Sequence, residues 1–421
     1  MLKALLTKKS PFYIQFYVSG KCNMLCRYCN IVEANSNLEE ASLNDIEKIA
    51  DNLARIGAGA VVLMGGEPFL RKDYPQIIKI FVKKGLNVRL QTSGMKVATP
   101  EMLKACVEAG ASDINVSLDS LNPSKQDYIT NVPGSWQEAI KTIAHISRIF
   151  PRKDAFTSFG TVLSAFNYGE IPYILELATK IGWQLSLVPA HITNIKFPKD
   201  YRSYDPDFIV SESNFKELDS VFKTILNMKK RGFNLFDSKV YLKSALHFIK
   251  TGHPTWRFKG VCDSPNLYFV IRPNGDFAVC ADYQLKGERV SLIDPLFSKV
   301  YKSQKFKKRV YDITKRCKGC QYGSFPEMSL SAHSISAMGD RLKAYLQVQK
   351  KGLKPFSYEE ILGIINDIKE KHPEIYDEKK HPDKYHNQLI LEWEKPDGRR
   401  KLQKEYIATR IREGRVRRKC R

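Results

Sequence analysis

Three cysteines near the start of the chain, Cys22, Cys26 and Cys29, have the spacing C-x3-C-x2-C. Iron-sulfur clusters are held by cysteine thiolates, normally by four of them. Three thiolates this close together can hold three corners of a four-iron cluster and leave one iron open for chemistry. A zinc site or three unrelated thiols are the alternatives, and zinc prefers four ligands in a closed site. The spacing therefore favours a catalytic metal centre.

A second set of cysteines lies far downstream, where a C-x17-C pair precedes a C-x2-C pair. Four thiolates can ligate a cluster completely and leave no iron free for substrate, so we expect such a cluster to move electrons. Zinc suits four cysteines equally well and stays an alternative. The members of this set are Cys262, Cys280, Cys317 and Cys320.

Two further cysteines stand alone. Cys106 lies in an apolar stretch and is expected to be a small buried side chain. Cys420 lies in the basic tail, and we assign it no role.

Short apolar segments alternate with amphipathic helical segments over the first 190 residues. Ser42 precedes a helical pattern as a natural N-cap, and Gly85 and Gly182 follow others as natural C-caps. Regular alternation of strand and helix predicts parallel strands joined by right-handed crossovers, and six such units predict a partial (β/α)6 barrel of the α/β class. The predicted strands are 13–18, 60–64, 87–92, 113–118, 156–163 and 185–189, and the predicted helices are 43–56, 74–84, 100–108, 136–149 and 171–181. Beyond the sixth strand, the pattern predicts helices at 211–231, 238–250, 358–371 and about 400–413, and a hairpin with an asparagine-glycine turn at 267–280.

Glycine and polar residues recur where these predicted strands end. The three-cysteine loop follows the first strand, Gly65-Gly66-Glu67-Pro68 follows the second, and Ser93 follows the third. Ser117 and Asp119 end the fourth strand. Because active sites of such barrels lie at the carboxyl ends of the strands, these residues are expected to share one rim.

The segment Cys22-Asn23-Met24-Leu25-Cys26-Arg27-Tyr28-Cys29, together with the Gly-Gly-Glu-Pro run, resembles the signature of the radical S-adenosylmethionine (SAM) enzymes. The resemblance covers roughly residues 12 to 190 and continues through the second cysteine set. It implies that a four-iron cluster binds SAM through its open iron. Reductive cleavage of SAM then gives a 5'-deoxyadenosyl radical that takes hydrogen from a substrate.

The resemblance also implies roles for the rim. The backbone of Gly65 and Gly66 can lie against a ligand, and Glu67 offers an anion to the methionyl ammonium group. Pro68 fixes the turn. Ser93, Ser117 and Asp119 are suited to ribose or methionyl contacts, although serine and aspartate are also ordinary turn formers. Tyr28 is expected near the adenine, with a plain core aromatic as the alternative.

The second cysteine set resembles the twitch form of the SPASM extension of this superfamily. The full SPASM extension would carry more cysteines soon after Cys320, and residues 321–326 contain none. We therefore expect two 4Fe-4S clusters, one that binds SAM and one auxiliary. The expected division is a barrel at 1–190, a helical connection at 191–260, a twitch-like domain at 261–326 and a basic helical extension at 327–421.

The chain of 421 residues has a formal net charge of +23, and much of this charge lies between Arg399 and Arg421. Such a tail could contact nucleic acid, an anionic membrane surface or an acidic partner, and it hints at an anionic substrate. No export signal or long apolar stretch is evident, so we expect a cytoplasmic enzyme.

The substrate and its product are not evident from the sequence. The enzyme would need a reducing electron donor such as flavodoxin or ferredoxin. The alternative reading is a non-catalytic zinc- or iron-sulfur-binding protein with a basic nucleic-acid-binding tail.

Overall fold

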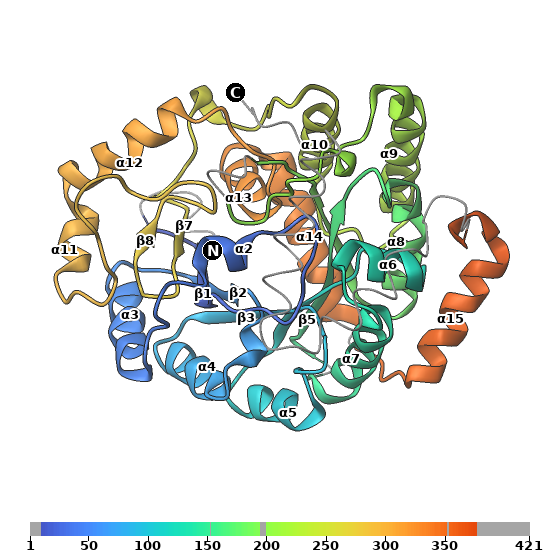
Figure 1. Cartoon of the computed structure of the whole chain (residues 1–421), viewed down its shortest axis with the longest axis horizontal. Helices are drawn as coiled ribbons and strands as arrows, with labels where there is room; N and C mark the ends of the chain where they lie inside the picture. The colour runs from blue at the N-terminus through green and yellow to red at the C-terminus, as the bar shows by residue number, and fades with distance from the viewer. Residues whose placement is uncertain (1–9, 152, 194–198, 352, 377–421) are drawn as a thin grey trace.

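A computed structural model describes residues 10–151, 153–193, 199–351 and 353–376 (Figure 1). The basic tail between Arg399 and Arg421, the helix expected near residues 400–413 and Cys420 lie outside the described residues. None of the described helices is long and apolar enough to cross a membrane.

Six parallel strands form the predicted sheet, in the order β6-β5-β4-β3-β2-β1. Each strand pairs in parallel with the next one along the chain, which confirms the α/β class and the six-unit partial barrel. The strands are β1 Tyr13–Ser19, β2 Ala60–Gly65, β3 Asn87–Thr92, β4 Asp113–Ser117, β5 Phe156–Leu163 and β6 Gln184–Pro189.

Alternate residues of the strands face opposite sides of the sheet. In β3, Val88 and Leu90 are buried in the apolar core, while Arg89 and Gln91, which alternate with them, are only half-buried. The apolar residues pack under the outer helices, and the polar ones face the interior of the barrel. The same alternation recurs in β4.

Outer helices cross from one strand to the next, as Figure 1 shows around the sheet. Several of them begin at side-chain caps: the Ser42 side chain, a predicted cap, accepts a hydrogen bond from the Asp45 N–H, and the Thr99 side chain, which was not predicted, accepts one from the Met102 N–H. The short helices at 31–35 and 123–130 were not predicted. The α-helices between β1 and β6 are α2 Ile31–Asn35, α3 Leu43–Arg55, α4 Tyr74–Lys83, α5 Pro100–Glu108, α6 Pro123–Thr130, α7 Ser135–Ile149 and α8 Ile171–Lys180.

The hairpin of the second cysteine region extends the barrel sheet. Strand β7 (Tyr268–Ile271) pairs in parallel with β1, so that Tyr13 lies opposite Tyr268, and β8 (Phe277–Ala278) pairs antiparallel with β7. The predicted hairpin is therefore present. Since its first strand joins β1, the sheet continues across the boundary expected at residue 261.

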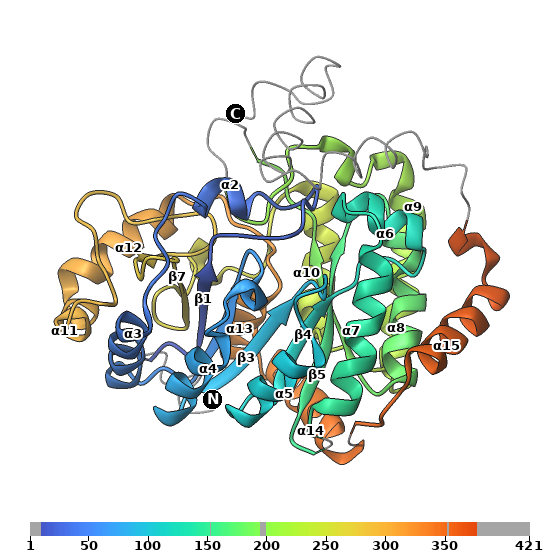
Figure 2. The ribbon, with the colours of Figure 1, turned by 60° about the horizontal axis from the view of Figure 1, so that its bottom comes forward.

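The remaining helices lie after the sixth strand. Helix α15 packs outside α7 and α8, and α14 packs on α10 and α13 (Figures 1 and 2). The helices at 211–231, 238–250 and 358–371 were predicted, and those between 297 and 351 were not. They are α9 Phe215–Lys230, α10 Lys239–Thr251, α11 Phe297–Lys302, α12 Gln304–Arg316, α13 Ser324–His333, α14 Ile335–Lys351 and α15 Tyr358–Lys371.

The start of α13 lies across the opening between the two ends of the six-stranded sheet. On one side, the Ser324 hydroxyl donates a hydrogen bond of 2.9 Å to the Tyr13 hydroxyl at the start of β1. On the other side, the Tyr241 hydroxyl donates to the carbonyls of Leu187 in β6 and Gln321 before α13. The segment that follows the second cysteine set thus forms part of the barrel wall.

Candidate active site

One large cavity lies at the carboxyl ends of the strands, and most of the predicted site residues line it. Figure 2 shows α2, which follows β1, and α6, which follows β4, at this same end of the barrel. Glu67 and Asp119 are fully buried and lie behind the lining. The predicted residues that line the cavity are Cys22, Cys26, Tyr28, Cys29, Gly65, Gly66, Pro68, Ser93 and Ser117.

The glycine pair fits closely against the start of the cysteine loop. The Gly66 N–H donates to the Ser19 carbonyl at 2.9 Å, and the Glu67 N–H donates to the Lys21 carbonyl at 2.8 Å. A β-carbon on Gly66 would lie 2.0 Å from the Lys21 oxygen, and one on Gly65, whose φ is +137°, would lie 2.3 Å from the Ser19 oxygen. Only glycine allows the two loops to approach this closely.

Glu67 joins the second strand loop to the third. Its carboxylate accepts hydrogen bonds of 2.7 Å from both the backbone N–H and the hydroxyl of Ser93, and one of 3.2 Å from the Phe69 N–H. Burial raises the pKa of Glu67, and the Ser93 hydrogen bonds oppose that rise. A contact between Glu67 and an ammonium group stays a prediction, whereas its hold on Ser93 is observed.

Asp119 orients Tyr28. The Tyr28 hydroxyl donates to one Asp119 oxygen at 3.0 Å, and the Val162 N–H donates to the other at 2.7 Å. Burial raises the pKa of Asp119 to about 7. The Tyr28 ring lines the cavity and meets Phe208 edge-on, with ring centroids 6.2 Å apart. Asp119 therefore acts on the cavity through Tyr28.

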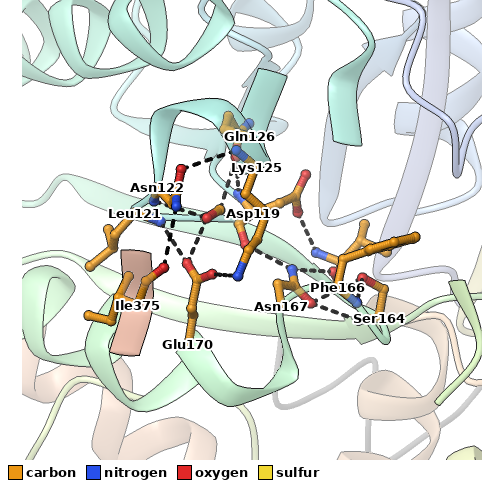
Figure 3. A network of polar contacts seen from close by, with 12 residues as sticks. Asp119, Leu121, Asn122, Lys125, Gln126, Ser164, Phe166, Asn167, Glu170 and Ile375 are labelled. Atoms are coloured by element: carbon orange, nitrogen blue, oxygen red, sulfur yellow. Dashed lines mark hydrogen bonds and ion pairs between the residues drawn. The ribbon is translucent and has the colours of Figure 1, made fainter. Parts of the chain in front are cut away.

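A buried polar network fixes the loop that follows β4 (Figure 3). Glu170 is paired with Lys125 and also accepts hydrogen bonds from the Ser120 hydroxyl at 2.6 Å and the Leu121 N–H at 3.1 Å. The Asn167 amide donates to the Asp119 carbonyl at 2.8 Å. The loop that carries Asp119 is thus held against the loop after β5.

Backbone N–H groups point at sulfur in both cysteine sets. Five of the seven cysteines accept a hydrogen bond from the backbone N–H two residues further along the chain. A hydrogen bond donated to sulfur favours the thiolate form of the cysteine. Burial raises the pKa of Cys29 to about 12, and a bound cation would counter such a rise. The pairs are Cys22 with Met24, Cys29 with Ile31, Cys280 with Asp282, Cys317 with Gly319 and Cys320 with Tyr322.

The four downstream cysteines line one small, mainly apolar cavity. Cys262 shares a hydrogen bond with Cys317, which lowers the pKa of Cys317 and raises that of Cys262. Among the described residues, no group of three or more His, Cys, Asp or Glu side chains is arranged to hold a single metal ion. A shared cavity lined by four thiols is a donor set that fits an iron-sulfur cluster.

Residues 200 to 202 connect the two cysteine sets. The Tyr201 N–H bonds to Cys29, and the Tyr201 hydroxyl donates to the Gly65 carbonyl at 3.1 Å. Arg202 forms a two-point ion pair with Asp282, which lies two residues after Cys280. Tyr201 has a φ of +56°, a costly conformation for a bulky side chain.

Tyr322 completes this connection from the other side. Its hydroxyl donates to the Asp200 carbonyl at 3.0 Å and lies 2.9 Å from an Asp282 oxygen. Since Tyr322 follows Cys320 by two residues and also lines the large cavity, it borders both regions.

His191, which lies just after β6, packs against the second cysteine region. Its ring stacks on Tyr322 with centroids 4.5 Å apart, and its Nε2 accepts the Gln321 N–H at 3.0 Å. Burial lowers the pKa of His191 to about 3, so the ring is neutral at ordinary pH.

The cavity also contains amides that sequence reasoning missed, namely Gln15, Gln91 and Asn115. Each lies inside a predicted strand, where a parallel sheet covered by helices is normally apolar. Polar residues at alternate strand positions, such as Arg89, Gln91 and Ser93, are the signal that could have revealed them.

The comparisons with known families and proteins agree with this geometry. Residues 16–178 match the model of the Radical SAM superfamily. The AdoMet-dependent heme synthase of Methanosarcina barkeri is 29% identical over 174 residues, which are 41% of this chain and 48% of that protein. The GTP 3',8-cyclase of Syntrophomonas wolfei is 33% identical over 194 residues, 44% of this chain and 55% of that protein. The chain thus spans about half the length of these relatives.

Two solved structures share the fold. SuiB of Streptococcus suis aligns with a TM-score of 0.53 and 16% identity over 78% of this chain and 76% of SuiB. The structure of anSMEcpe with bound AdoMet aligns with a TM-score of 0.51 and 14% identity over 90% of this chain and 99% of that one.

Proposed function

We propose that this chain, which carries a radical SAM domain over residues 16–178, cleaves SAM reductively and takes a hydrogen atom from a substrate held inside the barrel. A four-iron cluster on Cys22, Cys26 and Cys29, with SAM on its open iron, supplies the 5'-deoxyadenosyl radical when both are bound. The observation that carries the proposal is that these cysteines, the glycine pair and Ser93 line one cavity.

The chain's own residues would orient SAM in this cavity. Gly65 and Gly66 hold the cysteine loop close to the end of β2, and Glu67 holds Ser93 at the end of β3. Tyr28, aligned by Asp119, offers a ring face to the adenine, and the hydroxyls of Ser93 and Ser117 suit ribose or methionyl contacts.

We further propose that Cys262, Cys280, Cys317 and Cys320 hold an auxiliary four-iron cluster. The substrate radical would then pass one electron toward this set and a proton to solvent, in a net oxidation. The N–H groups directed at sulfur and the connection through residues 200 to 202 support this role. The first electron would come from a donor such as flavodoxin or ferredoxin.

Iron content and SAM cleavage test both assignments together. After anaerobic reconstitution, we expect about eight irons per chain, and about four in either Cys22→Ala or Cys262→Ala. Cys106→Ala is the matched control, because Cys106 is buried in helix α5 and lines neither cysteine cavity, so this variant should keep all the iron. Reduction in the presence of SAM should release 5'-deoxyadenosine from the unmodified chain and from Cys106→Ala, but not from Cys22→Ala.

Two results would overturn the proposal. A chain that binds zinc and no iron under these conditions would support a structural metal protein. Release of 5'-deoxyadenosine that is undiminished in Cys22→Ala would remove the three cysteines from the chemistry.

A further inference from the structure

The interior of this barrel contains several polar side chains, although barrel interiors are usually filled with branched apolar ones. The large cavity is lined by Gln15 from β1, Gln91 from β3 and Asn115 from β4. At Gly160 in β5, a β-carbon would lie 2.7 Å from the Asn115 side chain, so the glycine leaves room for this amide.

A second chamber lies deeper in the barrel. It shares Gln91, Asn115, Gly323 and Ser324 with the large cavity, so the two spaces are neighbours. Its volume is about 40 Å³, where about 10 to 15 Å³ holds one water molecule. The further lining residues are Tyr13, Arg89, Ser186, Phe236, Asp237, Glu327, Met328 and Arg341.

Two guanidinium groups in this chamber have unused donors. Arg341 is 8% exposed, and the structure gives it one ion pair, to Glu327 at 3.7 Å, within the described residues. The Arg89 Nη2 donates to Ser158, but its buried Nε has no hydrogen-bond partner among the described residues. Both groups lie over the Phe236 ring, with their central carbons 4.2 and 5.8 Å from its centroid. Spare guanidinium donors suit a carboxylate.

Two acceptor atoms in the chamber lack a hydrogen bond. Glu327 is 1% exposed, and its Oε2 has the 3.7 Å ion pair with Arg341 but no hydrogen-bond partner among the described residues, while its Oε1 accepts the Ser238 N–H at 2.6 Å. The Asn115 Oδ1 is likewise buried without such a partner. A buried acceptor atom without a hydrogen bond costs free energy, so a ligand that brings hydrogen-bond donors would be favourable here. By contrast, Asp237 is satisfied by the Ser186 hydroxyl and the Leu187 N–H.

When both carboxyl groups are ionised, the formal charges of the chamber cancel, because Arg89 and Arg341 face Asp237 and Glu327. The described lining of the large cavity contains no Lys, Arg, His, Asp or Glu. A ligand with several phosphate charges would meet no compensating cations there, so a net-neutral ligand with both donors and acceptors fits better.

We propose that this chamber binds the zwitterionic head of an α-amino acid. Its carboxylate would meet Arg341 and Arg89, and its ammonium group would meet Glu327 and Asn115. The rest of the molecule would extend past Gln91 into the large cavity. The assignment of this amino acid as the substrate rests on the function proposed above, while the binding itself does not.

Equilibrium dialysis with radiolabelled glycine tests the site on the full reconstituted chain. We expect saturable binding of the labelled glycine. Unlabelled glycine should displace it, whereas equal concentrations of acetate, methylammonium or N-acetylglycinamide should not. Arg341→Met should weaken glycine binding by at least about tenfold, since it removes charged hydrogen bonds. Arg55→Gln, an exposed arginine on α3, is the matched control and should bind as the unmodified chain does.

Asn115→Asp provides a second variant that preserves side-chain shape should Arg341→Met fold poorly. Its added negative charge should reverse the preference, so that methylammonium binds more tightly than glycine. Glycine binding that is absent, or equal in all variants, would overturn the inference, as would saturable binding of GTP in its place. Release of 5'-deoxyadenosine from the same samples distinguishes failure of the amino-acid site from failure of the proposed function. If SAM is cleaved but glycine does not bind, only the amino-acid site is rejected.

Discussion

Gly66 has no room for a β-carbon, because the Lys21 carbonyl would lie 2.0 Å away. Gly66→Ala should therefore displace the cysteine loop and reduce iron bound at the first cysteine set from about four per chain toward zero. Gly363→Ala is the matched control, since a β-carbon there meets nothing within 4 Å and the residue lies inside helix α15. That control should keep its iron and gain about 0.5 to 1 kcal/mol of stability. Equal iron in the two variants would show that the close approach does not matter.

Asp237 gives the stability of the chain a specific pH dependence. Burial raises its pKa to about 7 in the folded state, and the charge of Glu327 adds to the rise, while an unfolded aspartate titrates near 3.9. Between pH 4 and 7 the folded chain keeps a proton that the unfolded chain releases. The stability contributed by this proton is complete below pH 4 and is lost as the pH rises through 7.

Asp237→Asn should remove this loss. Relative to the unmodified chain, the free energy of unfolding of the variant should rise with pH, by at most about 1.4 kcal/mol per pH unit between 4 and 7. Urea unfolding at pH 5.5 and 8 measures the difference, and titrating groups that do not interact with Asp237 cancel between the two proteins. Parallel pH profiles would contradict the assignment.

The loop after β4 depends on the buried pair of Lys125 and Glu170 (Figure 3). Glu170→Gln should leave Lys125 buried without its anion and lower the free energy of unfolding by about 3 to 5 kcal/mol. The matched control is Glu138→Gln, because the pair of Glu138 with Lys141 is more exposed and should contribute less than about 1 kcal/mol. If the urea unfolding curves of the two variants coincide, the buried network does not stabilise the fold as expected.

The segment of residues 200 to 202 is the element through which the two cysteine sets would influence each other. Arg202 is paired with Asp282, and its positive charge acts on Cys320. Arg202→Gln should make the reduction potential of the downstream centre more negative, on the order of tens of millivolts, because the reduced cluster loses a compensating cation. Arg202→Lys keeps the charge and should shift the potential less. Redox titration followed by electron paramagnetic resonance reports the potentials, and an unchanged value in Arg202→Gln would exclude the coupling.

At the level of elements, periodic apolar patterns predicted the barrel well. The strands at 87–92 and 156–163 and the helix at 100–108 agree residue for residue with β3, β5 and α5. The helices between 297 and 351 were missed, although Ser303 caps α12 through the Phe306 N–H. The hairpin was predicted, but its pairing with β1 was not, because partners far apart in sequence leave no local signal.

The candidate site was predictable only where residue types are unusual. Clustered cysteines and a glycine pair are visible in the sequence, and they converge on one cavity. The connection through Tyr201 and Arg202 carries no such signature. Likewise, Arg341 reaches the barrel interior only because α14 packs beside α10 and α13. Long-range packing of this kind depends on the whole fold.

At the scale of the whole molecule, the strongly basic tail between Arg399 and Arg421 lies outside the described residues. We predict that removing it weakens binding of an anionic partner or substrate and leaves SAM cleavage unchanged. Retention on heparin and release of 5'-deoxyadenosine measure the two properties separately. A truncated chain with equal heparin retention would show that the tail is not the anion-binding element.

The central claim is that the first cysteine set holds a cluster whose open iron binds SAM. Electron paramagnetic resonance of the reduced Cys317→Ala chain, with the downstream set disabled, tests it most directly. We predict one four-iron signal that changes when SAM is added and that is absent when Cys26→Ala is combined with Cys317→Ala. A signal that SAM leaves unchanged, or one that survives Cys26→Ala, would contradict the account.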